Sequence, residues 1–228
     1  MVIKMEKNLN LQENESKRPE VSQKVINRLP RYYRYLRELL SKDILRISSQ
    51  ELSKLMGVTA SQIRQDFNCF GEFGQQGYGY NVQHLFDQIS DILGVNECYN
   101  AVIIGAGNLG SALAGATTFY NRGVFLKALF DVNPKIVGKD INGFTVMDWK
   151  DFGTYMFSNK VDIAVITVPK DQAAAVAQVV AAHGISGIWN FTGVELKIPK
   201  VPVKNVHMGD MLMTLCYEMR KSKDGDKD

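Results

Sequence analysis

The residues with the clearest chemical meaning form the glycine-rich run Gly105-Ala106-Gly107-Asn108-Leu109-Gly110, which directly follows the apolar segment 100–104. A GxGxxG run between a buried strand and a helix brings backbone N–H groups at the helix start close to a pyrophosphate. Gly105 would allow the tight turn, Gly107 the approach of the ligand, and Gly110 close packing of the helix on the strand. The run therefore predicts a phosphate-binding loop.

A carboxylate stands at the spacing that such a loop requires. Asp131 ends the apolar segment 125–131 and lies 21 residues after Gly110. An acid at this place accepts hydrogen bonds from the adenosine ribose hydroxyls and would repel a 2′-phosphate. The loop and the acid together predict NAD(H), rather than NADP(H), as the ligand.

Further strand and helix patterns extend the nucleotide fold. The segment 161–168 reads as a strand, Pro169 as the first turn of a helix over 170–183, and 187–191 as another strand. Ligands of open parallel sheets bind outside the carboxyl ends of the strands. The residues expected to face the nicotinamide half are Thr167, Val168, Pro169, Phe191 and Thr192.

Catalytic equipment is missing from this nucleotide-binding half. A dehydrogenase needs a group that moves a proton beside the hydride, and usually a second domain for the substrate. The segment 99–207 shows neither a Lys/Tyr/Ser triad nor a His/Asp pair, and His207 is the one titratable group near the pocket end. We expect no enzyme and NAD(H) as a regulatory ligand. An NAD-dependent oxidoreductase with an accessory DNA-binding domain is the alternative, and a fold that takes CoA or another nucleotide is a third, disfavoured by Asp131.

The front half has a different charge. Residues 17–64 carry eleven Lys and Arg against four Asp and Glu, a local balance of +7 in a chain of net charge +3. This asymmetry favours a front half that binds a polyanion, with an ordinary basic surface as the other interpretation. The longest apolar runs fall far short of the roughly 20 residues of a membrane-spanning helix, and residues 1–16 lack the apolar core of a signal peptide. We therefore expect a cytoplasmic protein.

Two closely spaced helix starts define the front half. Ser48 to Glu51 is a capping box that opens a helix over 49–56, and Gly57 ends it. Thr59 to Gln62 reads as a second capping box. Two capped helices joined by a glycine turn predict a helix-turn-helix, preceded by a short helix over 23–29 and, after an interruption at Pro30, an amphipathic helix over 31–41.

The DNA-facing residues follow from this arrangement. Ile63 and Phe67 lie one turn apart and should pack inward, which leaves residues 60–62, 64 and 65 of the second helix for the major groove. The residues expected to contact DNA from the helices are Arg31, Arg34, Ser48, Thr59, Ala60, Ser61, Gln62, Arg64 and Gln65. The segment 70–80 interleaves four glycines with aromatic residues, which predicts a hairpin wing. A tip such as Gln75-Gln76-Gly77 would enter the minor groove, and Tyr78 and Gly79 of the wing are also expected to contact DNA.

The resulting fold class is α/β, an N-terminal winged helix-turn-helix domain followed by a Rossmann-type parallel sheet. We expect a disordered arm over 1–16, the winged helix over 17–95, the nucleotide-binding domain over 96–208 and a dimerisation helix with its tail over 209–228. The last helix has an apolar stripe that needs a partner surface, either its own sheet or a second copy. Three scattered cysteines and three scattered histidines predict neither a disulfide framework nor a metal site.

These motifs, together with the runs 28–36, 63–67, 70–74, 77–80, 130–138, 167–169 and 190–192, resemble the bacterial Rex family of redox-sensing transcriptional repressors over about residues 19–217. The resemblance implies a homodimer with swapped C-terminal helices. It also implies that the NAD⁺-bound protein holds an A/T-rich inverted repeat and that NADH releases it. Lys135, His207 and Met208 join the cofactor-binding residues on this basis.

The chain departs from the family pattern at several positions. Gln65 and the pair Gln75-Gln76 stand where the family usually has basic residues, so the phosphate contribution to DNA binding should be smaller. Ala116 and His207 stand where the family has a tyrosine and an aspartate that link to an arginine matched by Arg28. We expect His207 to replace the aspartate, so that release by NADH varies with pH near the unperturbed imidazole pKa of roughly 6.5.

Overall fold

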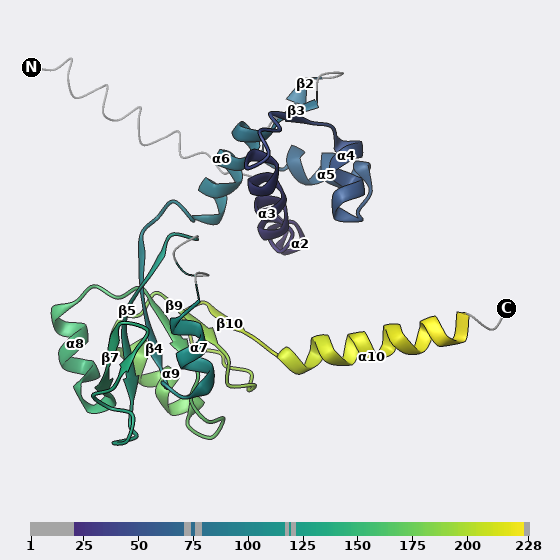
Figure 1. Cartoon of the computed structure of the whole chain (residues 1–228). Helices are drawn as coiled ribbons and strands as arrows, with labels where there is room; N and C mark the ends of the chain where they lie inside the picture. Colours follow the sequence, from purple (N-terminus) through teal and green to yellow (C-terminus); the bar gives the residue numbers. More distant parts are fainter. Residues whose placement is uncertain (1–20, 71–73, 76–78, 117–118, 120–121, 226–228) are drawn as a thin grey trace, which may run out of the picture. The chain divides into compact units, whose positions relative to one another are not determined.

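The computed structural model describes residues 21–70, 74–75, 79–116, 119 and 122–225, and the chain divides into two compact units at residues 94 and 95 (Figure 1). The expected arm over 1–16 lies outside the described residues. Within the described part, no helix combines the length and apolar character needed to cross a membrane. In the same part, no group of His, Cys, Asp and Glu side chains could hold a metal ion.

Unit 1 is a winged helix, as the sequence predicted. Its elements are α2 (Gln23–Ile26), α3 (Leu29–Leu40), β1 (Arg46–Ile47), α4 (Ser49–Met56), α5 (Ala60–Asn68), β2 (Gly74–Gln75), β3 (Gly79–Asn81) and α6 (Val82–Leu93). The three short strands form an antiparallel sheet in the order β1-β3-β2. The hairpin of β2 and β3 is the predicted wing, and α4 with α5 is the predicted helix-turn-helix.

The core of unit 1 forms where α3, α5 and β3 meet. Ile63 and Phe67 of α5 are almost fully buried, which confirms that they pack inward. The Phe67 ring lies 4.9 Å from the buried Tyr32 ring and 5.1 Å from the ring of Tyr80, measured between centroids. Helix α5 therefore packs on α3 and β3 through aromatic contacts on one of its faces.

Two details of the helix starts differ from expectation. Pro30 lies in the first turn of α3 instead of interrupting the chain before it, because proline at this position lacks only an N–H that would have no helical partner. The capping box at Ser48 is complete. At Thr59 only half of a box forms, since the Thr59 hydroxyl accepts from the Gln62 N–H while the Gln62 side chain turns to Asp66.

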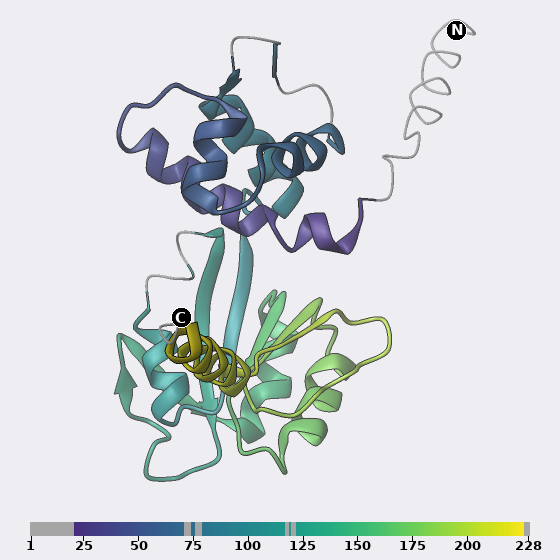
Figure 2. The ribbon, with the colours of Figure 1, turned by 90° about the vertical axis from the view of Figure 1, so that its right-hand side faces the viewer.

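Unit 2 is a seven-stranded sheet in the order β10-β9-β8-β4-β5-β7-β6, parallel except at β6. Its elements are β4 (Tyr99–Ile104), α7 (Asn108–Ala114), β5 (Val124–Asp131), β6 (Asp140–Ile141), β7 (Phe144–Asp148), the 3₁₀ helix η2 (Trp149–Asp151), α8 (Phe152–Ser158), β8 (Ile163–Ile166), α9 (Ala173–Ala182), β9 (Gly187–Asn190), β10 (Val203–Asn205) and α10 (Met208–Gly225). Figure 2 shows these strands and their flanking helices from a second side.

The sheet of unit 2 has a core on each face. Val102 and Ile104 of β4 share one cluster with buried residues of α8 and α9. Ile103, between them in the strand, belongs to a second cluster with Ala114 of α7. Successive side chains of a strand point to opposite faces, so a continuous apolar run such as 101–104 fits a strand covered on both sides.

Several predicted boundaries in unit 2 were wrong. The helix expected over 170–183 begins at Ala173, because Pro169 and the three residues after it form a turn first. The strand expected over 161–168 is limited to β8, and the one over 187–191 ends at Asn190. The sequence interpretation did not identify β6, β7, α8 or β10.

No face of helix α10 is covered by other described residues of the same chain. Its side chains over residues 208–223 are exposed, including the large apolar ones. Met211 is 79% exposed, Leu212 62% and Leu215 50%. The stripe seen in the sequence therefore has no intramolecular partner among the described residues.

Candidate functional site

The glycine loop joins β4 to α7 and is shaped by two glycines. Gly105 has φ +101°, and a Cβ atom there would lie 2.9 Å from the carbonyl carbon of Thr167. A Cβ on Gly110 would lie 2.0 Å from the Gly105 carbonyl oxygen. A Cβ on Gly107, in contrast, would meet no heavy atom within 4 Å, and this glycine is the residue before the first turn of α7. The loop is thus tightly packed at Gly105 and Gly110, and it leaves open space at Gly107, where a phosphate would approach.

Asp131 is held beside this loop at the carboxyl end of β5. Its Oδ2 atom accepts a hydrogen bond of 2.7 Å from the Ala106 N–H, and its Oδ1 atom accepts one of 2.8 Å from the Asn133 N–H. Both bonds come from the backbone, so the carboxylate is fixed without a cationic partner among the described side chains. The remaining lone pairs of its oxygens can accept from hydroxyl groups of a ligand.

A cavity of about 590 Å³ lies over the carboxyl ends of the strands next to this carboxylate. Six of the predicted cofactor-binding residues line it: Gly105, Gly107, Asp131, Thr167, Val168 and Pro169. The loop residues Ala106, Asn108, Leu109 and Gly110 and the more distant Lys135, Phe191, Thr192, His207 and Met208 do not belong to its described lining. The structure therefore joins the loop, the acid and the β8 end in one cavity.

The sequence interpretation missed a large part of this lining. The additional residues are Ile104, Phe130, Val132, Asn133, Ile136, Trp149, Gln172 and Val176. Trp149 directly follows β7, the strand beside β5. A signal for Trp149 was available in the sequence. The segment 144–148, directly before Trp149, has a strand pattern and lies between the predicted strands over 125–131 and 161–168. Gln172 and Val176 were not assigned to the site, because the helix was predicted to begin at residue 170 and α9 begins at Ala173.

The carboxyl end of β9 is fixed by a buried amide network. Asn190 is 1% exposed, and its Nδ2 atom donates to the Val194 carbonyl and to Asn205 Oδ1, each at 2.7 Å. Its Oδ1 atom accepts from both the N–H and the hydroxyl of Thr192. The loop that carries Phe191 and Thr192 is therefore anchored at the sheet edge, next to the end of β8.

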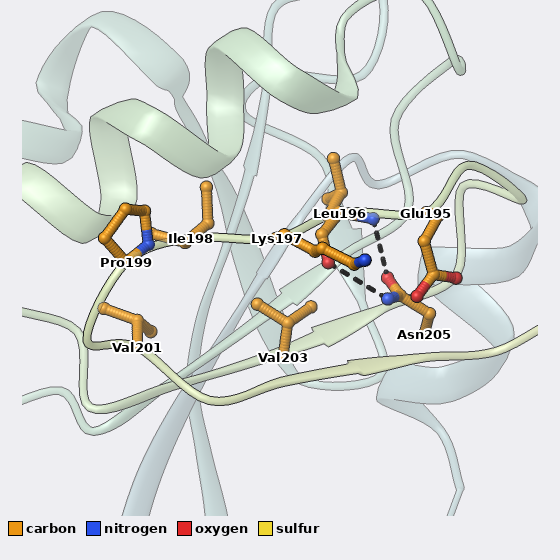
Figure 3. A pocket seen from close by; sticks show the side chains of 8 residues that line it. All are labelled: Glu195, Leu196, Lys197, Ile198, Pro199, Val201, Val203 and Asn205. Carbon is orange, nitrogen blue, oxygen red and sulfur yellow. Dashed lines mark hydrogen bonds between the residues drawn. The ribbon is translucent and has the colours of Figure 1, made fainter.

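The hairpin over residues 195–205 follows β9 in the chain and leads to α10. Asn205 accepts from the Leu196 N–H at 3.1 Å and donates to the Leu196 carbonyl at 3.0 Å, which closes the hairpin over residues 195–205 (Figure 3). His207 Nε2 lies 3.0 Å from Glu195 Oε2. The hydrogen bond with His207 lowers the pKa of the Glu195 carboxyl. The predicted site residue His207 thus pairs with Glu195 at the start of α10.

The predicted DNA-facing residues of α5 lie mostly on its exposed side. Ser61, Arg64 and Gln65 are exposed, and Ala60 and Gln62 are half-buried. Arg64 donates a hydrogen bond of 2.9 Å to the Ser49 hydroxyl in α4, which orients its guanidinium along the two helices. The start of the helix-turn-helix is polar and solvent-accessible, as contacts with a phosphate backbone require.

A buried carboxylate, Asp66, lies on the opposite side of the same helix. It is 0% exposed and accepts hydrogen bonds from Arg28 Nε at 2.7 Å, Arg28 Nη2 at 2.6 Å, the Tyr32 hydroxyl at 2.8 Å and Gln62 Nε2 at 2.8 Å. Burial alone would raise the pKa of Asp66, but the hydrogen bonds from Arg28, Tyr32 and Gln62 outweigh it and lower the pKa. The network joins Arg28, directly before α3, and Tyr32 within α3 to helix α5.

The remaining predicted DNA contacts have mixed placements. Arg31 donates to the Met56 carbonyl at the end of α4, while Arg34 lies exposed with its guanidinium 5.5 Å from the Tyr35 ring centroid. Gly79 has φ +68° and lies against the Ile47 backbone, so it shapes the wing. Gln75 belongs to β2. Gln76, Gly77 and Tyr78 fall outside the described residues.

Two family models match the chain, one in each unit. The model described as "Putative DNA-binding protein N-terminus" matches residues 20–68. The model described as "CoA binding domain" matches residues 96–194. The first covers α2 to α5 and the second covers the sheet from before β4 to beyond β9, so both agree with the observed fold.

Curated relatives match nearly the whole chain. The redox-sensing transcriptional repressor Rex of Clostridium botulinum strain Hall is 51% identical over 208 residues, which are 91% of this chain and 99% of the relative. That of strain Eklund 17B is 50% identical over the same shares. Both are named as repressors and not as dehydrogenases, despite the dehydrogenase-like nucleotide fold.

Solved structures show the same architecture. The crystal structure of RSP in complex with beta-NAD+ and operator DNA matches with a TM-score of 0.84 and 50% identity, covering 92% of this chain and 97% of that one. The structure of RSP in complex with beta-NADH matches with a TM-score of 0.83 and 47% identity, covering 92% and 99%. At this identity and coverage the assignment is direct: the chain belongs to the Rex family of redox-sensing transcriptional repressors.

Proposed function

We propose that this repressor binds operator DNA as a dimer through its winged helices and is released when NADH replaces NAD⁺ in unit 2. The observation that carries the proposal is the cavity that brings Gly105, Gly107 and Asp131 together in a chain whose other unit is a winged helix. RSP, a Rex-family repressor, has been solved both with beta-NAD+ and operator DNA and with beta-NADH.

The residues of the cavity fit a dinucleotide. The open space at Gly107 accepts a pyrophosphate at the start of α7. Asp131, with two backbone donors already bound, would accept from the ribose hydroxyls, and its charge opposes a 2′-phosphate. We assign the loop residues 105–110 and Lys135 to the same half of the ligand.

The nicotinamide half would extend from the β8 end of the cavity along the neighbouring strand ends. Thr167 to Pro169 follow β8, and Phe191 and Thr192 follow the neighbouring β9. His207 lies two residues after the end of β10, the next parallel strand, and Met208 begins α10. Carboxyl ends of parallel strands meet at one edge, so these segments provide the surface on which a second nucleotide would lie.

DNA contacts are assigned to the exposed surface of the helix-turn-helix. Thr59, Ala60, Ser61, Gln62, Arg64 and Gln65 would enter the major groove, with Ser48 and Arg34 at the backbone. The wing residues 75–79 would enter the minor groove. Arg31 serves the fold through its bond to Met56, and any contact with a phosphate would come from its remaining donors.

Helix α10 supplies the dimer contact in this proposal. Its exposed stripe of Met211, Leu212, Leu215 and Met219 has no partner within the described chain, and a second copy would cover it by exchange of the helix. Two winged helices related by a two-fold axis would read an inverted repeat, which we expect to be A/T-rich. A repressor of this kind would work in the cytoplasm.

The test is a DNA-binding titration by fluorescence anisotropy on a labelled A/T-rich palindrome with no nucleotide, NAD⁺, NADH or NADPH. NADH should weaken binding, NAD⁺ should preserve it, and NADPH should have a much smaller effect because of Asp131. If neither NAD⁺ nor NADH changes the affinity, the sensor proposal is wrong. Turnover of NADH with small carbonyl compounds would instead support the oxidoreductase alternative.

A further inference from the structure

Two amide side chains tie together three segments at the end of the sheet that leads into α10. The segments are the loop 191–194 after β9, the start of the hairpin over 195–205, and the stretch 206–207 between β10 and α10. Asn190 ends β9, Asn205 ends β10, and the two residues are partners in the parallel register of these strands. Neither belongs to the described lining of the nucleotide cavity, so their side chains act on the surrounding backbone and not on a ligand in that cavity.

The side chain of Asn190 holds the loop that we assign to the nicotinamide half. Its Oδ1 atom accepts from the Thr192 N–H at 3.0 Å and from the Thr192 hydroxyl at 2.7 Å. Its Nδ2 atom donates to the Val194 carbonyl and to Asn205 Oδ1, each at 2.7 Å. These bonds use both donors and both acceptor sites of the amide. Since Asn190 is 1% exposed, water cannot replace one of them if it breaks.

The side chain of Asn205 holds the hairpin and lies close to the start of α10. Its Oδ1 atom also accepts from the Leu196 N–H at 3.1 Å, and its Nδ2 atom donates to the Leu196 carbonyl at 3.0 Å (Figure 3). The N–H of the next residue, Val206, donates to the Asn190 carbonyl at 2.8 Å. Only residues 206 and 207 separate Asn205 from Met208, where α10 begins. The amide pair therefore fixes the point at which the chain leaves the sheet for α10.

An ion pair lies next to this network but is a weaker link. His207 Nε2 is 3.0 Å from Glu195 Oε2, and the two side chains are 32% and 59% exposed. Ion pairs that water reaches contribute little to stability, because water and salt screen them. The hydrogen bonds of Asn190, in contrast, belong to a buried and fully paired group. The amide pair is therefore the stiffer connection between the loop 191–194 and the start of α10.

A displacement of the loop has two possible outcomes at this network. A ligand that moves Thr192 either breaks a hydrogen bond of Asn190 or moves Asn190 and Asn205 together. The first outcome leaves a buried polar atom without a partner, which costs more than a hydrogen bond contributes net. The second keeps every bond and carries the stretch 206–207 along. Because the second outcome has the lower free energy, the loop and the start of α10 should move as one unit.

We propose that Asn205, through its bond to Asn190, is the positioning residue that makes the start of α10 follow the nicotinamide loop, so that NADH binding changes operator binding. The inference rests on the proposed function, because it takes from it both the nicotinamide position at Thr192 and the response to NADH. Coupling between two binding sites typically corresponds to roughly a fivefold to 150-fold change in affinity. Its loss is therefore measurable.

Three full-length proteins separate this coupling from ligand binding: the unaltered chain, Asn205→Ala and Asn159→Ala. In Asn205→Ala the link to α10 is removed while Asn190 keeps its bonds to the loop. Asn159→Ala is the matched control, because Asn159 is exposed and donates a side-chain hydrogen bond of 2.9 Å to the Tyr155 carbonyl. Calorimetry measures NADH affinity, and fluorescence anisotropy measures operator affinity with and without saturating NADH.

We expect Asn205→Ala to bind NADH within about threefold of the unaltered chain, while the change in operator affinity caused by NADH falls below about twofold. Asn159→Ala should keep the full change. Asn205→Asp retains an oxygen that accepts from Asn190 and from the Leu196 N–H, so it should restore at least half of the change on a logarithmic scale. A merely structural contribution of Asn205 would lower the unfolding midpoint and NADH affinity of Asn205→Ala without removing the effect of NADH on operator binding.

Hydrogen exchange of the unaltered chain gives a measurement that needs no variant and still decides if Asn205→Ala fails to fold. NADH should change the protection of peptides from 187–197 and from 204–214 together. The inference is overturned if NADH changes only the first peptide, if Asn205→Ala keeps the full NADH effect, or if Asn205→Asp loses the effect as completely as Asn205→Ala. Each of these results leaves the proposed function standing. An unaltered chain whose operator affinity does not respond to NADH would refute the proposed function and this inference together.

Discussion

Replacing Asp66 by Asn should destabilise unit 1, because Asp66 is the buried acceptor of the hydrogen-bond network that joins α5 to Arg28 and α3. The substitution preserves the size of a fully buried side chain that accepts two hydrogen bonds from Arg28, one from Tyr32 and one from Gln62. It removes the negative charge and presents an amide N–H₂ group to donors. The Arg28 guanidinium would then lose its anionic partner while its position in the fold stays the same.

The size of the effect follows from the burial of the two partners. Removing one member of a buried ion pair typically costs about 3–5 kcal/mol. The Arg28 side chain is 29% exposed and that of Asp66 1%, so water can compensate the arginine in part. We therefore expect a loss near the lower end, about 3 kcal/mol, which for a domain of this size lowers the unfolding midpoint on the order of 15 °C.

The pH dependence of this loss has a defined sign. The folded pKa of Asp66 is lowered, so its contribution to stability is complete above the unfolded value of about 3.9 and disappears as the pH falls through the folded value. The difference in stability between the unaltered chain and Asp66→Asn should be constant near pH 7. It should shrink below about pH 4, where the carboxyl becomes protonated first in the unfolded chain and then in the folded one.

Hydrogen exchange of peptides from 29–40 and 60–68 in the full-length chain measures this stability locally. A matched control is Asp87→Asn, since Asp87 is exposed and accepts a side-chain hydrogen bond of 2.8 Å from Gln83. The control should change stability by less than about 0.5 kcal/mol. Equal protection in the Asp66 and Asp87 variants, or a difference that persists unchanged at pH 3, would refute the reasoning. Operator affinity should fall with Asp66→Asn, because the network positions α5.

Three further predictions concern other parts of the structure, and two of them compare a pair of variants. Gln65→Lys adds a cation to the exposed side of α5 and should steepen the plot of log affinity against log salt by about 0.9, measured by anisotropy; an unchanged slope would exclude a phosphate contact there. Gly110→Ala places a Cβ atom 2.0 Å from a backbone oxygen and should lower both the unfolding midpoint and NADH affinity, whereas Gly107→Ala, with open space around it, should lower the affinity alone. Leu215→Asp on α10 should give a species near the 25.6 kDa of one chain in light scattering, while Arg220→Asp on another side of the helix should not; a dimer in both would remove α10 from the interface.

The fold was predictable because its signals are local. The capping box at Ser48 and the glycine at residue 57 fix α4 through backbone hydrogen bonds within a few residues. The loop from Gly105 to Gly110 likewise carries its steric reasons in its own sequence. Such patterns predict both units and the part of the cavity lining formed by the glycine loop, Asp131 and the residues after β8. The end of the short helix before α3 and the start of α9 were predicted wrongly, because both lie next to a proline, which allows more than one local geometry.

The missing features depend on contacts between distant segments. Asp66 appears in the sequence as one polar residue of a helix, and only the approach of Arg28, 38 positions away, shows why it is buried. Trp149 enters the cavity because β7 pairs with β5, a register that no local pattern specifies. Buried polar groups must be hydrogen-bonded, so a polar residue on the inner face of a predicted amphipathic helix is the one hint that was available for Asp66.

The two-ligand character of this repressor has a consequence that does not depend on how the units move. If saturation of both sites of the dimer with NADH lowers operator affinity by some factor, operator DNA must lower the product of the two NADH association constants by the same factor, because the binding free energies share one thermodynamic cycle. NADH titrations with and without a saturating operator duplex therefore have to give the reciprocal shift. Agreement of the two factors would show that both ligands select between the same states of the protein, whereas a mismatch would mean that the species compared in the two titrations differ in their assembly, so that the titrations do not close one cycle.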